Sequence, residues 1–282
     1  LTVGAPTIHT VLAEAGKTIA RRRRAPLTII RRVMERLLSP KQVMEVLTAS
    51  MIKKNDKYTY VQGTRFMDHG ARNYDVAGYR LPSVTTILGR TKDETYLRQW
   101  IAKKGKEEAE RIKTQSATRG TSMHKYLENY VLGKGYEDLT ELGQLTKHMA
   151  QKVIEVGLAP VSEYFGSEVT LYYPGLYAGS TDLVGIHNGK ETVMDFKQAN
   201  RPKREEWIGD YKLQAAAYAM AHDQVHGSAI EQCVIMVCTP DLYYQEFKID
   251  GLNLRKAKYA FLKRLDEYHE LTKDEKEVAN GT

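Results

Sequence analysis

The sequence predicts an α/β protein in which a central mixed β-sheet is flanked by helices, with helical additions at its N-terminal end. Two observations lead to this fold class. Strand-like apolar segments are mixed with helical ones, and an Asn-Gly dipeptide between alternating apolar runs is typical of a β-hairpin. Strands mixed with helices favour a sheet covered by helices. In chain order, the expected elements are helices at 93–114, 119–133 and 138–156, strands at 166–173, 178–187 and 190–198, a helix at 203–226, strands at 231–239 and 242–249, and a helix at 252–272.

The first fifty residues differ from the rest of the chain in charge. They hold nine basic and three acidic side chains, so residues 51–282 carry only +1 of the chain's net charge of +7. Within 7–48, apolar residues recur at three- and four-residue spacing, which predicts helix. We therefore expect residues 1–50 to be a basic helical extension that is dispensable, with a nucleic-acid-binding arm as the alternative. Residues 51–282 are expected to form the main domain.

The composition excludes several classes of protein. No run of about 18 apolar residues occurs in the sequence, so we expect a soluble, intracellular protein without a transmembrane helix. The two cysteines, Cys233 and Cys238, lie within one apolar run. They can supply neither a disulfide framework nor a four-cysteine metal cluster, and they favour a reducing compartment.

The hairpin at 178–198 is the most informative segment. If Asn188-Gly189 forms its two-residue turn, Asp182 lies directly opposite Asp195, with the Cβ atoms about 5 Å apart. Lys197 follows Asp195 by two residues and therefore points to the same face of the sheet. The sequence thus predicts two carboxylates and an amine gathered at one place.

Two carboxylates on neighbouring strands repel each other, and a cation between them relieves the repulsion. Oxygen ligands without cysteine suit Mg²⁺ or Mn²⁺. Such an ion would polarise a phosphoryl oxygen and acidify bound water. Lys197 could then orient the attacking water, act as its base if its pKa falls, or stabilise the transition-state charge. The alternative is an ordinary exposed hairpin with two solvated acids, which the short Asp-x-Lys pattern alone does not exclude.

Two further pairs stand four residues apart on predicted helices and so share a helix face. His124 and Glu128 are one pair, Gln214 and Tyr218 are the other, and Tyr211 extends the face of the second pair. Each has an ordinary alternative. The first could be a surface His–Glu pair, and the second could pack an aromatic ring into the core.

Taken in order, four short motifs resemble the RecB-like branch of the PD-(D/E)XK nuclease superfamily over residues 79–250. The motifs are Gly120-x-x-x-His124, Gly179-x-x-Asp182, Asp195-x-Lys197 and Gln214-x-x-x-Tyr218. Within the branch, the chain is most similar to the mitochondrial genome maintenance exonucleases and their phage relatives, a group whose pattern Pro82-Ser83-Val84-Thr85 also matches. The resemblance implies that the sheet and its helices form a restriction-endonuclease-like core.

The resemblance also implies a role for each matched residue. The catalytic residues would be Asp182, Asp195 and Lys197. The metal ion would be held by His124, Asp182, Asp195 and the backbone carbonyl of Phe196. The residues that organise the site or contact nucleic acid would be Glu128, Gln214, Tyr218, Ser83 and Thr85. An additional acid would come from Glu168.

The activity that the resemblance implies is a metal-dependent DNA exonuclease, a phosphodiester hydrolase that uses Mg²⁺ or Mn²⁺ on single strands or strand ends. Such an enzyme would act in DNA replication or repair, in a phage or mitochondrial setting, with replication or recombination proteins as partners. A structure-specific endonuclease of the same superfamily and a catalytically inactive DNA-binding relative are the alternatives. No iron–sulfur cluster is expected, because the iron–sulfur nucleases of this branch need four cysteines and the chain has two.

Overall fold

The computed structural model describes residues 52–280, so the expected extension at 1–50 lies outside the described residues. The helices are α4 (Val84–Arg90), α5 (Thr95–Lys104), α6 (Lys106–Val131), α7 (Glu141–Val156), the short 3₁₀ helix η1 (Glu205–Trp207), α8 (Gly209–His226) and α9 (Gly251–Asn280). The strands are β1 (Lys53–Lys54), β2 (Thr64–Asp68), β3 (Ala71–Val76), β4 (Tyr79–Pro82), β5 (Val161–Tyr173), β6 (Tyr177–His187), β7 (Lys190–Gln198), β8 (Gln232–Cys238) and β9 (Tyr244–Asp250).

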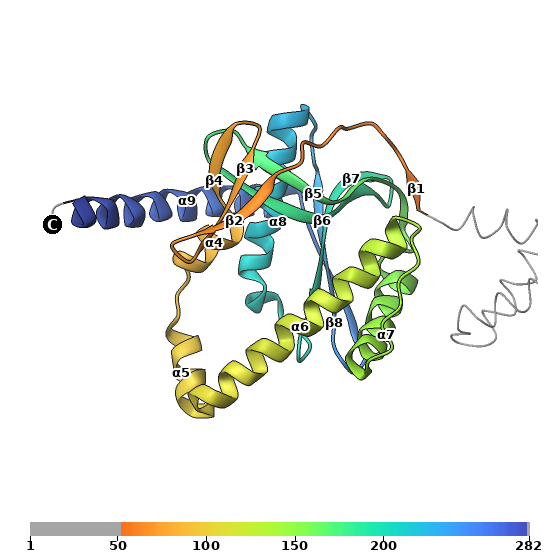
Figure 1. Ribbon diagram of the computed structural model, residues 1–282. Coiled ribbons are helices and arrows are strands. Elements are labelled where there is room, and N and C mark those ends of the chain that lie inside the picture. Colours follow the sequence, from red (N-terminus) through yellow and green to blue (C-terminus); the bar gives the residue numbers. More distant parts are fainter. Residues whose placement is uncertain (1–51, 281–282) are drawn as a thin grey trace, which may run out of the picture. The chain divides into compact units, whose positions relative to one another are not determined.

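The centre of the described chain is a six-stranded sheet in the order β1-β5-β6-β7-β8-β9 (Figure 1). The β1–β5 and β7–β8 pairs are parallel, and the other neighbouring pairs are antiparallel. The sheet is therefore mixed, as the sequence predicts, and its layout is consistent with a restriction-endonuclease-like core. A second, three-stranded antiparallel sheet is formed by β2, β3 and β4.

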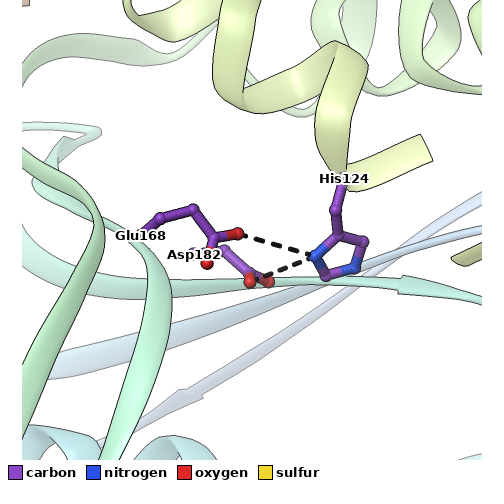
Figure 2. A group of neighbouring side chains, drawn as sticks. All are labelled: His124, Glu168 and Asp182. Carbon is purple, nitrogen blue, oxygen red and sulfur yellow. Dashed lines mark ion pairs between the residues drawn. The ribbon is translucent and has the colours of Figure 1, made fainter. Parts of the chain in front are cut away.

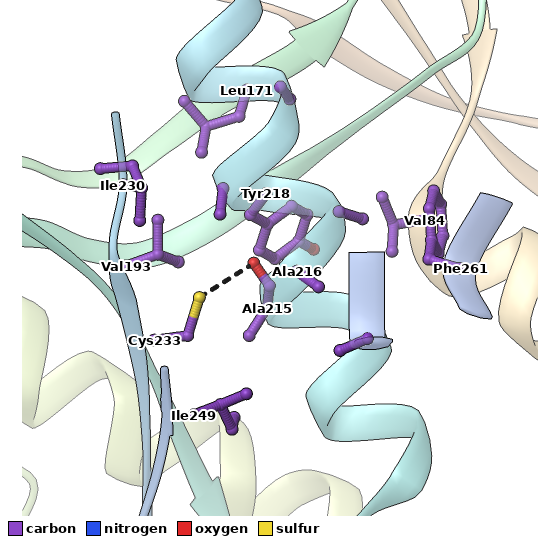
Figure 3. Packing of buried hydrophobic residues seen from close by; sticks show 14 of the residues in the cluster. Val84, Leu171, Val193, Ala215, Ala216, Tyr218, Ile230, Cys233, Ile249 and Phe261 are labelled. Atoms are coloured by element: carbon purple, nitrogen blue, oxygen red, sulfur yellow. Dashed lines mark hydrogen bonds between the residues drawn. The ribbon is translucent and has the colours of Figure 1, made fainter. Parts of the chain in front are cut away.

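Helices cover both faces of the large sheet. Because side chains alternate along a strand, Val193 and Leu183 fall on opposite faces and belong to different core clusters. The cluster that contains Val193 is completed by α4, α8 and α9, and the cluster that contains Leu183 by α6 and α7. Small side chains let α8 lie close to the sheet. Figure 3 shows Ala215 beside Cys233 of β8, whose Sγ donates a hydrogen bond to the Ala215 carbonyl at 3.5 Å.

The hairpin between β6 and β7 has the predicted turn and register. Asn188 and Gly189 have φ values of 49° and 77°, so both turn residues are left-handed. Paired positions run from His187–Lys190 to Leu183–Met194, and the pairing stops there. Beyond this point β6 remains paired with β5, and β7 remains paired with β8. The two strands thus part into a fork one residue before Asp182 and Asp195 would have paired.

The helix bounds differ from the sequence prediction at α8, which begins at Gly209 and not at 203, at α9, which extends to Asn280 and not to 272, and most of all around Gly105. We expected one helix at 93–114 and another from 119, but the break lies at Gly105, whose φ of 86° is unfavourable for other residues. Residues 106–131 form one helix that runs through Gly120, because a glycine inside a helix lowers its stability without ending it. His124 therefore stands on a long continuous helix.

The segment at 79–89 contains β4 and all of α4 except its last residue. The hydroxyl of Ser83 caps α4 by accepting a hydrogen bond from the Thr86 amide at 2.9 Å. Among the described residues, no helix is long and apolar enough to span a membrane.

Candidate metal and active site

The fork between β6 and β7 is closed by a side chain instead of a backbone pair. Asp182 Oδ2 accepts a hydrogen bond from the Phe196 amide at 2.5 Å. Asp195 lies next to Phe196, within the part of β7 that pairs with β8, and only 2 % of its surface is exposed. The fork therefore holds two aspartates in the interior. We predicted a directly opposed pair on a continuous ladder, and the structure shows a side-chain link across two diverging strands.

Glu168 brings a third carboxylate to the fork from β5. Its neighbours Ser167 and Val169 pair with Leu183 and Thr181, which places Glu168 opposite Asp182. Its φ of 53° lies in the left-handed region, which costs a residue with a Cβ about 1 kcal/mol or more. Strained backbone of this kind is concentrated at functional sites.

His124 reaches the two outer carboxylates from α6, as Figure 2 shows. Its Nδ1 lies 3.2 Å from Asp182 Oδ1 and 3.9 Å from Glu168 Oε1. One donor atom from each of these three residues falls within 4.8 Å of the others, so they could hold one metal ion. One imidazole and two carboxylates are a donor set that fits a divalent cation.

The charges of the site are strongly coupled. Burial lowers the pKa of His124, but Asp182 and then Glu168 outweigh burial and raise it to about 10. Burial raises the pKa of Asp182, yet His124 and Lys197 together hold it below its ordinary value. For Asp195, burial and the charge of Asp182 win over the attraction of Lys197, and its pKa rises to about 6. A cation among these acids would relieve their mutual repulsion.

Lys197 sits beside Asp195, with Nζ 2.5 Å from Asp195 Oδ2. Burial lowers its pKa, but the charges of Asp195 and Asp182 outweigh burial and raise it. Its Nζ also lies 5.3 Å from the centre of the Tyr211 ring on α8. Lys197 is therefore a protonated amine held between an aspartate and an aromatic ring.

The predicted pair on α8 joins the same region through packing. Gln214 Nε2 donates a hydrogen bond to the Tyr218 hydroxyl at 3.1 Å, and the Tyr218 ring is buried in the core. A Cβ on Gly179 would come within 2.6 Å of that ring. Gly179 and Tyr218, from the second and fourth motifs, are thus complementary in shape. Their predicted part in organising the site stays a prediction.

The other predicted site residues have clear structural settings. Glu128 forms an ion pair with Lys125 at 3.2 Å. Ser83 is buried as the α4 cap, and Thr85 is exposed next to it, with the two hydroxyls 3.0 Å apart. Phe196 donates its amide to Asp182. The phosphate contacts of Ser83 and Thr85, the site role of Glu128 and the metal bond of the Phe196 carbonyl stay predictions.

Sequence reasoning missed a clamp that joins α6 to the end of β7. Arg119 is buried, and its Nε donates to Gln198 Oε1 at 2.9 Å while its Nη2 donates to Asn200 Oδ1. Gln198 Nε2 also donates to the Ser116 carbonyl at 2.9 Å. The clamp fixes the helix of His124 to the strand of Lys197. The presence of Arg119 one residue before the Gly-x-x-x-His motif was the only sequence signal for it.

Comparison with known proteins finds similarity to solved structures alone. No protein-family model and no curated protein sequence matches the chain. A protein from Eubacterium rectale, provisionally described as an exonuclease, is 11% identical, with a TM-score of 0.41 over 55% of this chain and 67% of that one. An alkaline exonuclease from Laribacter hongkongensis is 14% identical, with a TM-score of 0.24 over 59% of this chain and 99% of that one. The same enzyme in complex with dAMP gives 16% identity and a TM-score of 0.27. At these values the similarity does not assign the chain to a family.

Proposed function

We propose that the chain is a metal-dependent nuclease that hydrolyses phosphodiester bonds in DNA, acting as an exonuclease on single strands or strand ends. One observation carries this proposal. At the β6–β7 fork, a histidine and two acidic side chains bring donor atoms close enough together to share a cation, and a lysine next to them is ion-paired with the buried Asp195. Carboxylates, a divalent cation and an ammonium group are what the hydrolysis of a charged phosphodiester requires.

The metal ion would be Mg²⁺ or Mn²⁺, held by His124, Asp182 and Glu168. Asp195 and the carbonyl of Phe196 are the further ligands that the sequence motifs suggest. When bound, such an ion supplies Lewis-acid polarisation of the phosphate and a more acidic water. Glu168 would take a larger part than the sequence suggested, because it belongs to the three residues whose donor atoms lie close together.

The residues around Lys197 indicate which catalytic role it would take. In the metal-free protein its raised pKa keeps it protonated at neutral pH, which favours donation of hydrogen bonds over abstraction of a proton. An ammonium group there can orient the attacking water and stabilise charge that develops on the phosphate oxygens. Asp195 holds Lys197 in position through their ion pair. Of the three roles considered from the sequence, the general-base role is therefore the least favoured.

The test measures release of nucleotides from labelled single strands in the presence of Mn²⁺ or Mg²⁺. The Asp195→Ala plus Lys197→Ala protein should lose this activity. The matched control is Lys248→Ala plus Asp250→Ala, which removes a more exposed Lys–Asp pair at 3.0 Å and should keep it. Activity that persists in the first variant would refute the proposal.

Two further substrates and readouts separate the alternative functions. Covalently closed circular DNA stays intact with an exonuclease and is cut by an endonuclease. A protein that binds DNA and cleaves none of these substrates with either metal ion would be an inactive DNA-binding relative.

A further inference from the structure

The crossover between β7 and α8, residues 199–208, is an ordered basic segment next to the site. It begins two residues after Lys197. Backbone and side-chain hydrogen bonds fix it to the sheet. The Ala199 amide donates to the Cys238 carbonyl at 3.2 Å. The Gln245 side chain accepts from the Lys203 amide at 2.6 Å and donates to the Lys203 carbonyl at 2.9 Å. The conformation of the segment is therefore set before any ligand binds.

Arg204 of this segment lies 3.8 Å from Glu206, but two other cations of the segment lack acidic partners in the described part of the chain. Neither Arg201 nor Lys203 has a carboxylate within 4.0 Å among the described residues. Burial lowers the pKa of Lys203, and the positive charges of Lys92 and Arg201 lower it further. Lys92 itself has Asp210 at 3.5 Å. Three cations thus lie close enough to repel one another with one acid between them, which is an arrangement that a polyanion stabilises.

A large exposed aromatic ring completes the segment. Trp207 is 56% exposed, and the guanidinium of Arg204 lies 5.0 Å from its ring centre. Trp207 is the last residue of η1, and Tyr211 follows four residues later in the first turn of α8, so the backbones of the two residues are at most about 14 Å apart. The Tyr211 ring in turn lies 5.3 Å from Lys197 Nζ. The exposed ring is therefore linked to the predicted chemistry through Tyr211, within the reach of a few nucleotides of an extended strand.

We propose that residues 199–208 form a docking site for single-stranded nucleic acid, with Arg201, Lys203 and Lys92 contacting phosphates while the Trp207 ring stacks on an unpaired base. This inference rests on the proposed function and specifies how its substrate is held. An indole ring backed by a guanidinium offers a stacking face that is independent of base identity. Paired bases inside a duplex do not offer a free face, so the site should select unpaired strands.

The first test measures binding without cleavage. The full chain is titrated, in EDTA, into a fluorescent oligothymidylate of about 12 nucleotides, and anisotropy is recorded. Trp207→Ala should weaken binding about tenfold, equivalent to about 1.4 kcal/mol, within the range for one stacked base. Trp207→Phe should restore most of the affinity, because the ring is retained. Tyr259→Ala is the matched control, since Tyr259 is also an exposed ring near a cation, Lys263, and its loss should leave binding unchanged.

The second test separates phosphate contacts from stacking. Arg201→Ala plus Lys203→Ala should reduce the slope of log affinity against log salt by about 1.4, from two lost contacts to a single strand. A direct signal comes from Trp100→Phe, which leaves Trp207 as the one tryptophan of the chain. Its fluorescence should be quenched as the oligonucleotide binds.

The inference is overturned if Trp207→Ala binds like the unchanged protein, if the Trp207 fluorescence does not respond, or if a blunt duplex binds as tightly as the single strand. These outcomes differ from failure of the proposed function. Binding that follows the predictions, in a protein that cleaves no substrate with metal, would refute the nuclease and leave the docking site standing. Metal-dependent cleavage in a protein whose binding and cleavage are insensitive to Trp207→Ala would refute the docking site and leave the nuclease standing.

Discussion

Metal binding at the fork should release one proton, which comes from His124. In the metal-free protein the pKa of this side chain is raised to about 10, chiefly because Asp182 outweighs the effect of burial. A metal-ligating imidazole must be neutral, so the ion competes with the proton. At about pH 7.5, roughly 2.5 pH units below that pKa, this competition costs about 3.4 kcal/mol of binding free energy. Metal affinity should therefore rise about tenfold per pH unit up to about pH 10.

The assay is calorimetric titration with Mn²⁺ at about pH 7.5 in two buffers of different ionisation enthalpy, which counts released protons. The unchanged protein should release about one proton per ion, and His124→Gln should release almost none. Asp195 has a pKa of about 6 and is already ionised at this pH. His148→Gln is the matched control, since His148 lies on α7 and its Nδ1 is 2.8 Å from the Gln144 carbonyl. Fewer than half a proton in the unchanged protein, or the same count in His124→Gln, would refute the reasoning.

Three further outcomes follow from the geometry. Gly179→Ala should lower the free energy of unfolding by about 1–3 kcal/mol, measured with denaturant, because its Cβ would press on the Tyr218 ring. Gly209→Ala is the control and should leave that free energy unchanged, because a Cβ there meets no atom within 4 Å. Equal losses in the two variants would contradict the packing argument. Glu168→Gly should be about 1 kcal/mol more stable than Glu168→Ala in thermal unfolding, because glycine tolerates the positive φ. Both variants should bind Mn²⁺ more weakly than the unchanged protein. Equal stabilities of the two variants would argue against backbone strain. Lys197→Met should slow strand cleavage about 10²- to 10⁴-fold in a gel assay and keep Mn²⁺ binding, and a rate within threefold would remove Lys197 from the mechanism.

The hairpin could be predicted from sequence because its information is local. Asn188-Gly189 specifies the turn, and the turn fixes the register as far as Leu183–Met194. The turn does not fix the point at which the two strands part, because that point depends on the pairing of β6 with β5 and of β7 with β8. The sequence therefore placed Asp182 and Asp195 in one region, but it could not show that Asp182 replaces a backbone pair.

Contacts between distant segments were less predictable. The approach of His124 to Asp182 depends on how α6 crosses the sheet, and helical spacing does not specify that crossing. The small sheet of β2, β3 and β4 was missed because its two-residue turns, His69-Gly70 and Ala77-Gly78, lack the Asn or Asp that marks such a turn, although all four residues have positive φ. The left-handed backbone of Glu168 has no sequence signal at all, since glutamate rarely adopts it.

The hydrogen bond that closes the fork turns the Phe196 amide into a spectroscopic reporter. The Phe196 nitrogen lies 2.5 Å from a carboxylate oxygen, so its amide proton should resonate far downfield in an NMR spectrum. The signal should move when that carboxylate changes its charge or its partner. The signal of this one isotope-labelled phenylalanine could therefore report metal occupancy of the site in solution, without any need for catalytic turnover.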